Sequence, residues 1–214
     1  MKRSKSNLYS FTSCVLLSIY SIFVNTKIEG EHFLPKTGSI ILVSNHISFL
    51  DPIALGYLAN RRKRQISFLA KDSLFKNKFV GYYLRRCQQI PVSRGTDKAK
   101  DSLFHAEKAL RLEKCIGVYP EATISTTKEL LPIKSGVIRL AQLSGAEVIV
   151  VGTSGAQNIW TKGSKPKFKI RTKHYMVVSR GFKIPENKDI DEAREELQIL
   201  MDKLAKEAQR KLER

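Results

Sequence analysis

Residues 40–51 read Ile-Ile-Leu-Val-Ser-Asn-His-Ile-Ser-Phe-Leu-Asp, an apolar run that leads into a histidine and, after four further residues, an aspartate. The run Ile40–Val43 has the length and composition of a buried strand. A histidine at a strand end, with a carboxylate able to fold back onto Nδ1, is placed to take a proton from a hydroxyl through Nε2. The spacing therefore predicts that His46 is a base and that Asp51 orients it.

The same stretch also has a purely structural interpretation. Asp51-Pro52 before Ile53-Ala54-Leu55 suits the start of a helix, with Asp51 as N-cap and Pro52 at the first helical position. The two roles are compatible. A single histidine-to-aspartate spacing also arises by chance, so the rest of the chain has to decide.

Further polar segments follow short apolar runs. Tyr-Pro-Glu-Ala-Thr-Ile-Ser at 119–125 follows the run 115–118, so polar groups again stand at a predicted strand end, where open α/β sheets bind their ligands. Between these two segments, residues 90–95 read Ile-Pro-Val-Ser-Arg-Gly. Lys-Ser-Gly at 134–136 opens an apolar-periodic stretch, and the apolar run 148–151 comes after it.

This ordered set resembles the glycerolipid acyltransferase family typified by 1-acylglycerol-3-phosphate O-acyltransferase. The family motifs run Asn-His-x4-Asp, Pro-x-x-Arg, Phe-Pro-Glu-Gly-Thr-Arg-Ser and an apolar strand, and the resemblance covers about residues 28–185. The matching positions are Asn45, His46, Asp51, Pro91, Arg94, Pro120, Glu121, Thr123 and Ser125. The chain departs from the pattern at Ala122, Ile124 and Val150, where the family usually has glycine, arginine and proline.

The resemblance implies a direct acyl transfer. A neutral His46 would take the proton of a lysophospholipid hydroxyl as the oxygen attacks an acyl thioester, and Asp51 would fix the tautomer and stabilise the imidazolium. The thiolate would leave without an acyl-enzyme. The expected reaction converts 1-acylglycerol 3-phosphate to phosphatidate with no cofactor, and acyl-coenzyme A or acyl-carrier protein is the co-substrate.

Resemblance and chemistry together assign substrate binding to Asn45, Arg94, Glu121, Thr123 and Lys134. The planar guanidinium of Arg94 suits a phosphate, although the residue also fits a solvated loop. By resemblance Glu121 shapes the acceptor site, and a partly buried glutamate bound to backbone amides is the alternative. Lys134 precedes a predicted helix start, where a phosphate is also favoured.

Because Ile124 replaces the arginine of the family motif, the sequence does not decide which lipid is the acceptor. Either Lys134 or Lys128 supplies the charge of the missing arginine, or the acceptor carries no phosphomonoester at that place and is another lysolipid or a glycolipid. A third alternative is a non-catalytic basic protein that binds membranes or nucleic acid.

Composition fits one α/β domain with an anionic partner. The chain has 214 residues and a formal charge of +18. Residues 61–100 contain twelve Lys/Arg and two acidic residues, and residues 148–185 contain eight Lys/Arg and no acidic residue. Nucleic acid, anionic lipid and the phosphates of an acyl donor all suit such patches. No zinc-finger spacing or aromatic ribonucleoprotein motif is present, so we expect no nucleic acid partner.

Cys14, Cys87 and Cys115 lack metal-like or paired spacing and are expected to be reduced packing residues.

The N-terminus predicts membrane association. Residues 6–26 carry no charge and follow Lys2, Arg3 and Lys5. The segment lacks the small-residue cleavage pattern of a secretory signal. If it were a spanning helix, the basic residues before it would stay inside and the domain would lie outside, away from cytoplasmic acyl thioesters. A weak polar stripe favours a helix lying in one leaflet, formed by Ser10, Ser13, Ser18, Ser21 and Asn25. We therefore expect a membrane-associated helix over residues 1–27, an acyltransferase domain over 28–214, and a location on the cytoplasmic face of the membrane.

The remaining pattern alternates strands and helices, which predicts a single-domain α/β fold with a mixed sheet flanked by helices. Strands are expected near 39–44, 66–70, 88–92, 115–119, 147–152 and 173–179. Helices are expected near 52–60, 73–86, 97–113, 135–144 and 189–212. Trp160 is either an interfacial anchor or a core aromatic. His32, His105 and His174 lack a context that indicates chemistry.

Overall fold

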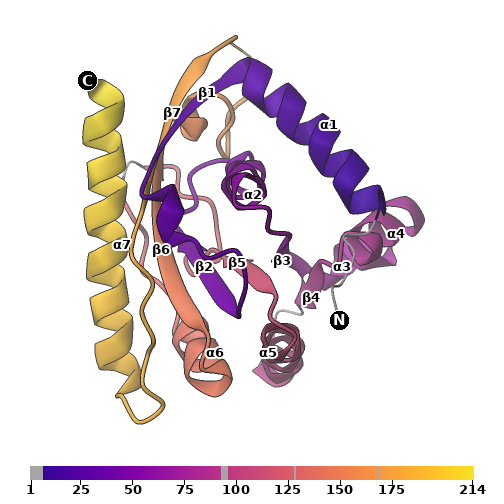
Figure 1. Cartoon of the computed structure of the whole chain (residues 1–214), viewed down its shortest axis with the longest axis vertical. Helices are drawn as coiled ribbons and strands as arrows, with labels where there is room; N and C mark the ends of the chain where they lie inside the picture. Colours follow the sequence, from indigo (N-terminus) through magenta and orange to yellow (C-terminus); the bar gives the residue numbers. More distant parts are fainter. Residues whose placement is uncertain (1–6, 93–95, 128, 168) are drawn as a thin grey trace.

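The computed structural model describes residues 7–92, 96–127, 129–167 and 169–214. Within these residues, seven strands form one sheet in the order β1-β7-β6-β2-β5-β3-β4 (Figure 1). The strands are β1 (Val24–Glu29), β2 (Ile40–Ser44), β3 (Ile66–Lys71), β4 (Ile90–Val92), β5 (Cys115–Val118), β6 (Glu147–Ser154) and β7 (Thr172–Val178).

The sheet is mixed, as the sequence predicts. Strands β6, β2, β5, β3 and β4 are mutually parallel, β7 runs antiparallel to β6, and β1 runs parallel to β7. All five residues of β2 are buried, which explains its continuous apolar run, because a central parallel strand is covered on both faces.

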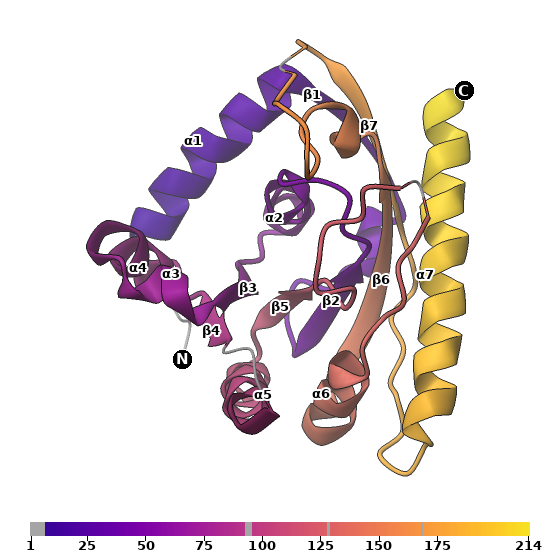
Figure 2. The same ribbon diagram turned by 180° about the vertical axis from the view of Figure 1, so that it is seen from behind.

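Helices cover both faces of the sheet (Figures 1 and 2). Helices α1 (Asn7–Phe23) and α2 (Asp51–Arg61) pack over one face around a core that contains Tyr20 and Leu58. Helices α5 (Thr96–Arg111), α6 (Gly136–Ser144) and α7 (Ile190–Glu213) cover the other face. Short helices complete the chain, namely α3 (Asp72–Lys76), α4 (Lys78–Arg86), and the 3-10 turns η1 (Glu31–Phe33) and η2 (Ala156–Asn158).

Strand β1 is not among the strands expected from the sequence. Helix α1 ends at Phe23, and Val24 already pairs with Thr172 of β7. The sheet thus begins inside the segment that the sequence assigns to the N-terminal helix, and Asn25 of the polar stripe lies on β1 rather than on a helix. The local sequence does not show where the helix ends, because β1 is formed by pairing with the distant strand β7.

The single helix expected over residues 73–86 is instead two helices that meet at Asn77. Asn77 has extended backbone angles, and its side chain accepts hydrogen bonds from the amides of Phe79 and Val80 at 3.0 Å each. An asparagine that caps in this way starts a new helix rather than continuing the previous one.

The parallel order brings three loops to one edge of the sheet. Strands β2, β5 and β6 run in the same direction, with β2 between the other two. The segments that follow their carboxyl ends therefore meet, as expected for a ligand site in an open α/β sheet. No helix among the described residues combines the length and the apolar composition needed to cross a bilayer.

Candidate active site

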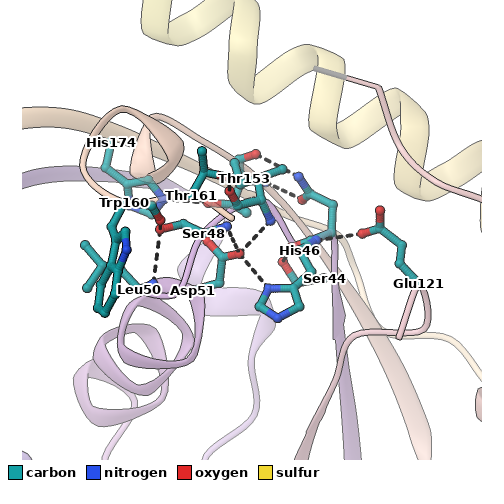
Figure 3. Close-up of polar contacts among 12 residues, drawn as sticks. Ser44, His46, Ser48, Leu50, Asp51, Glu121, Thr153, Trp160, Thr161 and His174 are labelled. Carbon is teal, nitrogen blue, oxygen red and sulfur yellow. Dashed lines mark hydrogen bonds and ion pairs between the residues drawn. The ribbon is translucent and has the colours of Figure 1, made fainter. Parts of the chain in front are cut away.

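His46 and Asp51 meet in the loop between β2 and α2. The distance from His46 Nδ1 to Asp51 Oδ2 is 2.9 Å (Figure 3). The imidazole is 17% exposed and the carboxylate 1%. Leu50 is the N-cap of α2, so Asp51 is its first helical residue and Pro52 its second, one position earlier than the sequence predicts.

Asp51 holds the whole loop through one oxygen. Besides His46, its Oδ2 accepts hydrogen bonds from the amides of Ile47 and Ser48, both at 2.7 Å. Burial raises the pKa of the Asp51 carboxyl above its usual value, and the hydrogen bonds from His46, Ser48 and Ile47 oppose that rise. Because the carboxylate is the acceptor, His46 donates its Nδ1 hydrogen, and the Nε2 atom of the neutral ring keeps its lone pair.

His46 forms part of the wall of an apolar cavity of about 380 Å³. Helix α1 contributes Leu16 and Leu17 to this wall, β3 contributes Phe68, and the segment after β5 contributes Tyr119. The Tyr119 ring stacks on the imidazole, with centroids 4.2 Å apart and 19° between the planes. The imidazole of His46 thus borders the apolar cavity, while Asp51 lies buried behind it.

The segment after β5 is bound to the same loop by its backbone. The Ser125 amide donates to the His46 carbonyl at 2.7 Å. Glu121 accepts from the amide of His46 at 2.6 Å and from that of Leu131 at 2.9 Å. Burial raises the pKa of Glu121, and these two backbone bonds oppose the rise. These contacts match the structural alternative for Glu121, a buried glutamate that joins two loops.

Ala122 stands where the related motif has glycine, and its backbone explains that glycine. Its φ is 58°, in the left-handed region, which is unfavourable by roughly 1–2 kcal/mol for residues with a Cβ. Glycine would adopt this turn without that cost.

Asn45 links this loop to β6. Its side-chain amide donates to the Thr153 carbonyl at 3.0 Å and accepts from the Thr153 amide at 2.9 Å. Asn45 is only 5% exposed, so these contacts give it a positioning role.

The segment after η2 closes the other side of the histidine loop. Ser48 Oγ donates to the Trp160 carbonyl at 2.6 Å, and Thr161 Oγ1 donates to the Ile47 carbonyl at 2.8 Å. The Trp160 ring is only partly buried and packs against Phe49, with centroids 4.8 Å apart. Trp160 therefore belongs to the packing that supports the site.

Lys162 brings a cation that the sequence reasoning missed. Its Nζ lies 3.4 Å from Thr123 Oγ1, next to Ile124, which occupies the position of the family's arginine. The basic run after Trp160 was the available signal, but the contact joins residues 39 positions apart.

The other predicted cations are placed less fully. The Lys134 amide donates to the Pro120 carbonyl at 3.0 Å, and its side chain is exposed. Arg94 and Lys128 lie outside the described residues. No cluster of three or more histidine, cysteine, aspartate or glutamate side chains in the described ranges is arranged to hold a metal ion.

His174 is also better connected than the sequence indicates. It is buried in β7, where its Nδ1 contacts Tyr20 Oη at 2.9 Å and its Nε2 contacts Thr153 Oγ1 at 2.5 Å. Thr153 in turn binds Asn45. Burial lowers the pKa of His174 to about 3, so the ring is neutral and links α1 to the residue beside His46.

The fold therefore places a His-x4-Asp pair at the end of a central strand of a mixed α/β sheet, beside an apolar cavity. The family model described as Acyltransferase matches residues 25–154, more than half of the chain. The chain therefore belongs to the acyltransferase family, as the motif resemblance predicts. It is an acyltransferase enzyme similar to proteins of phospholipid biosynthesis.

Individual relatives agree with this membership. The 1-acyl-sn-glycerol-3-phosphate acyltransferase of Bacillus subtilis is 28% identical over 159 residues, which cover 73% of this chain and 77% of the relative. The protein of the same name from Borreliella burgdorferi is 26% identical over 151 residues, covering 70% and 59%. A crystal structure of the 1-acyl-sn-glycerophosphate (LPA) acyltransferase PlsC from Thermotoga maritima aligns with a TM-score of 0.75 at 22% identity, covering 97% of this chain and 83% of that one. That likeness confirms the fold.

Proposed function

We propose that this enzyme moves a fatty acyl group from an acyl thioester to the free hydroxyl of 1-acylglycerol 3-phosphate and so forms phosphatidate. The observation that carries the proposal is the 2.9 Å contact from His46 Nδ1 to the buried Asp51, in the wall of an apolar cavity. The names of the relatives support the choice of acceptor.

In the proposed mechanism His46 acts as a general base. Its Nε2 takes the hydroxyl proton as the acceptor oxygen bonds to the thioester carbonyl carbon. The carbon–sulfur bond then breaks, and the thiolate leaves as a thiol after it takes the proton from the imidazolium. Asp51 stabilises the transient imidazolium through Nδ1. Acyl-coenzyme A or acyl-carrier protein serves as co-substrate, and no cofactor takes part.

The apolar cavity beside His46 is the proposed place for an acyl chain. Leu16, Leu17 and Phe68 supply apolar surface, and apolar surface favours a hydrocarbon chain over water by about 25 cal/mol for each Å² buried. A chain lying there holds its thioester carbon close to the imidazole.

The acceptor phosphate is proposed to lie over the loop that contains Thr123. Lys162 contacts Thr123 and so places a cation beside the position of Ile124, and Arg94 and Lys134 are the sequence-derived candidates that complete the subsite. A lysine is a point donor, whereas the absent arginine would have gripped two phosphate oxygens. We therefore expect acceptance of lysophosphatidate with less discrimination among phosphorylated acceptors.

Membrane association through α1, on the cytoplasmic face, is part of the proposal. Helix α1 buries Tyr20 against the domain and leaves large apolar side chains exposed, namely Val15, Leu16, Ile19 and Ile22. An apolar helix face of this kind, combined with a basic protein surface, suits a helix that lies in the plane of an anionic leaflet.

The deciding experiment measures thiol release from acyl-coenzyme A with a panel of acceptors, using the full chain and its His46→Ala variant. We expect turnover with lysophosphatidate and almost none in the variant. His105→Ala is the matched control, because His105 is an exposed histidine on α5. A folded His46→Ala protein with normal turnover would refute the assignment.

A second acceptor class remains a specific alternative because Ile124 replaces the arginine of the motif. If an uncharged glycolipid or a headgroup-bearing lysophospholipid has a higher kcat/KM than lysophosphatidate, the site is that of a related lipid acyltransferase. If no acceptor supports thiol release and the protein still binds membranes, the non-catalytic alternative gains support.

A further inference from the structure

The corner formed by α3 and α4 has an unusually apolar outer surface. Phe79 is 88% exposed and Tyr82 is 57% exposed, and Leu74 and Val80 are exposed beside them. Most exposed aromatic side chains on a soluble surface stand alone, whereas neighbouring large apolar groups mark a contact surface. We refer to Leu74, Phe79, Val80 and Tyr82 as the corner patch.

The corner is a built feature rather than a loosely packed end. Asn77 accepts hydrogen bonds from the amides of Phe79 and Val80 and so fixes where α4 begins. Gly81 is buried where the helices cross, and a Cβ there would lie 2.2 Å from the Phe75 carbonyl oxygen. Arg85 donates to that same oxygen at 2.9 Å.

Positive charge surrounds the corner patch. Residues 73–86 contain no acid, and four exposed cations lie among the apolar groups, namely Lys76, Lys78, Arg85 and Arg86. The Arg86 guanidinium lies over the Tyr82 ring, 5.8 Å from its centroid. An apolar centre with a cationic rim complements an anionic lipid surface, where the rings enter the acyl boundary and the cations meet the headgroups.

The corner also borders the cavity that contains His46. Tyr83 and Leu84 of α4 and Leu16 and Leu17 of α1 line this cavity together. Figures 1 and 2 show α3 and α4 at the far end of α1 from β1. The cavity therefore lies between two helices that each expose apolar side chains to the outside.

We propose that the corner patch is a second membrane-docking element that inserts into an anionic leaflet beside α1. Docking by both helices would place the cavity at the lipid surface, so that acyl chains pass between bilayer and cavity without crossing water. This inference rests on the proposed function for its purpose, but the docking itself is measurable without turnover.

The first test is vesicle sedimentation of the full chain with phosphatidylglycerol-containing vesicles. Burial of one Phe side chain predicts that Phe79→Ser lowers vesicle affinity about tenfold or more. Phe104→Ser is the matched control, because Phe104 is 60% exposed on α5, across the sheet from α1. Unchanged binding by Phe79→Ser, or an equal loss in Phe104→Ser, would overturn the proposal.

The second test places a reporter in the patch. In a Trp160→Phe background, Phe79→Trp should show a blue-shifted emission on addition of anionic vesicles and quenching by brominated lipid. Phe104→Trp in the same background should show neither. The absence of both signals at position 79 contradicts insertion.

The third measurement separates this proposal from its rivals. If the purified chain is a dimer in solution and Phe79→Ser makes it monomeric, the patch is a self-association surface and membrane docking is wrong. With a water-soluble short-chain lysophosphatidate, Phe79→Ser should keep wild-type turnover, because His46 is untouched. If Phe79→Ser loses vesicle binding and neither the wild type nor the variant shows turnover, the docking proposal is supported and only the proposed function is contradicted.

Discussion

Asn45 and Thr153 form a closed pair, in which the asparagine side chain donates to the carbonyl and accepts from the amide of the same residue. The pair ties the loop of His46 to the neighbouring strand β6 at the point where both strands end. Thr153 also contacts His174, which contacts Tyr20 of α1. The position of the proposed base is therefore set by a polar chain that crosses the core.

Replacing Asn45 by aspartate should damage this arrangement, because a carboxylate cannot donate to the Thr153 carbonyl. The unsatisfied buried group is expected to cost about 1–3 kcal/mol in the free energy of unfolding. We expect kcat to fall while KM changes little, since Asn45 positions the loop rather than the substrate. Urea unfolding and steady-state kinetics measure the two effects. A large rise in KM at constant kcat would instead assign Asn45 to substrate binding.

Asp51→Asn tests the orienting role of the carboxylate. The loss of tautomer control and of imidazolium stabilisation should lower kcat by about 10²–10⁴-fold. In this variant the loop amides of Ile47 and Ser48 keep an acceptor only if the new side-chain amide turns its oxygen toward them. Amide exchange at these two residues reports whether the loop stays intact. A well-formed loop with unchanged kcat would contradict the mechanism.

Lys162→Ala tests the proposed acceptor subsite. Loss of one charge-assisted contact should raise the KM for lysophosphatidate about three- to tenfold and leave the KM for the acyl donor nearly unchanged. Lys165→Ala is the matched control, because it removes an exposed lysine from the same segment without a contact to Thr123 among the described residues. Equal effects in the two variants would show that only general surface charge matters.

The parts of the molecule that follow from short-range patterns were predictable. Strand β2 is a continuous apolar run because both of its faces are covered, and its burial could be predicted from composition alone. The His46–Asp51 contact needs only one loop to fold back. Helix α7 has acids in its first turn and bases in its last, as the helix dipole favours.

The parts that depend on distant partners were not predictable. Strand β1 exists because β7 pairs with it, although Lys27 and Glu29 make its sequence only weakly strand-like. His174 and Tyr20 meet across 154 positions, and Lys162 reaches Thr123 from a loop after another strand. Single-sequence patterns contain no signal for such pairs, so the polar chain through the core and the contact of Lys162 with Thr123 emerged only from the fold.

The role of α1 in membrane binding is best tested by surface substitutions. Deletion of residues 1–26 would remove the buried Tyr20 and the first residues of β1, so loss of binding would be confounded by unfolding. Ile19→Ser with Ile22→Ser leaves the core intact and should weaken vesicle binding, because both side chains are exposed. Ile199→Ser, at an exposed isoleucine on α7, should have no effect. Unchanged binding in the double variant contradicts the in-plane helix.

The neutral His174 predicts a specific pH dependence of stability. Its pKa is lowered to about 3 in the folded protein, so below pH about 6.5 the unfolded chain binds a proton that the folded chain does not. As the pH is lowered from about 6.5 toward 3, the free energy of unfolding should therefore fall by about 1.4 kcal/mol for each pH unit. Above pH about 6.5 this contribution is constant.

The variant His174→Gln isolates that contribution, because glutamine does not titrate. The raised pKa values of Asp51 and Glu121 act in the opposite direction, since their folded forms bind protons more readily as the pH falls. They are present in both proteins, so the difference between the two unfolding curves reports His174 alone. The stability advantage of the wild type over His174→Gln should shrink as the pH falls below about 6.5. Parallel curves across that range would mean that His174 is protonated in the fold, and the neutral link between α1 and Thr153 would have to be abandoned.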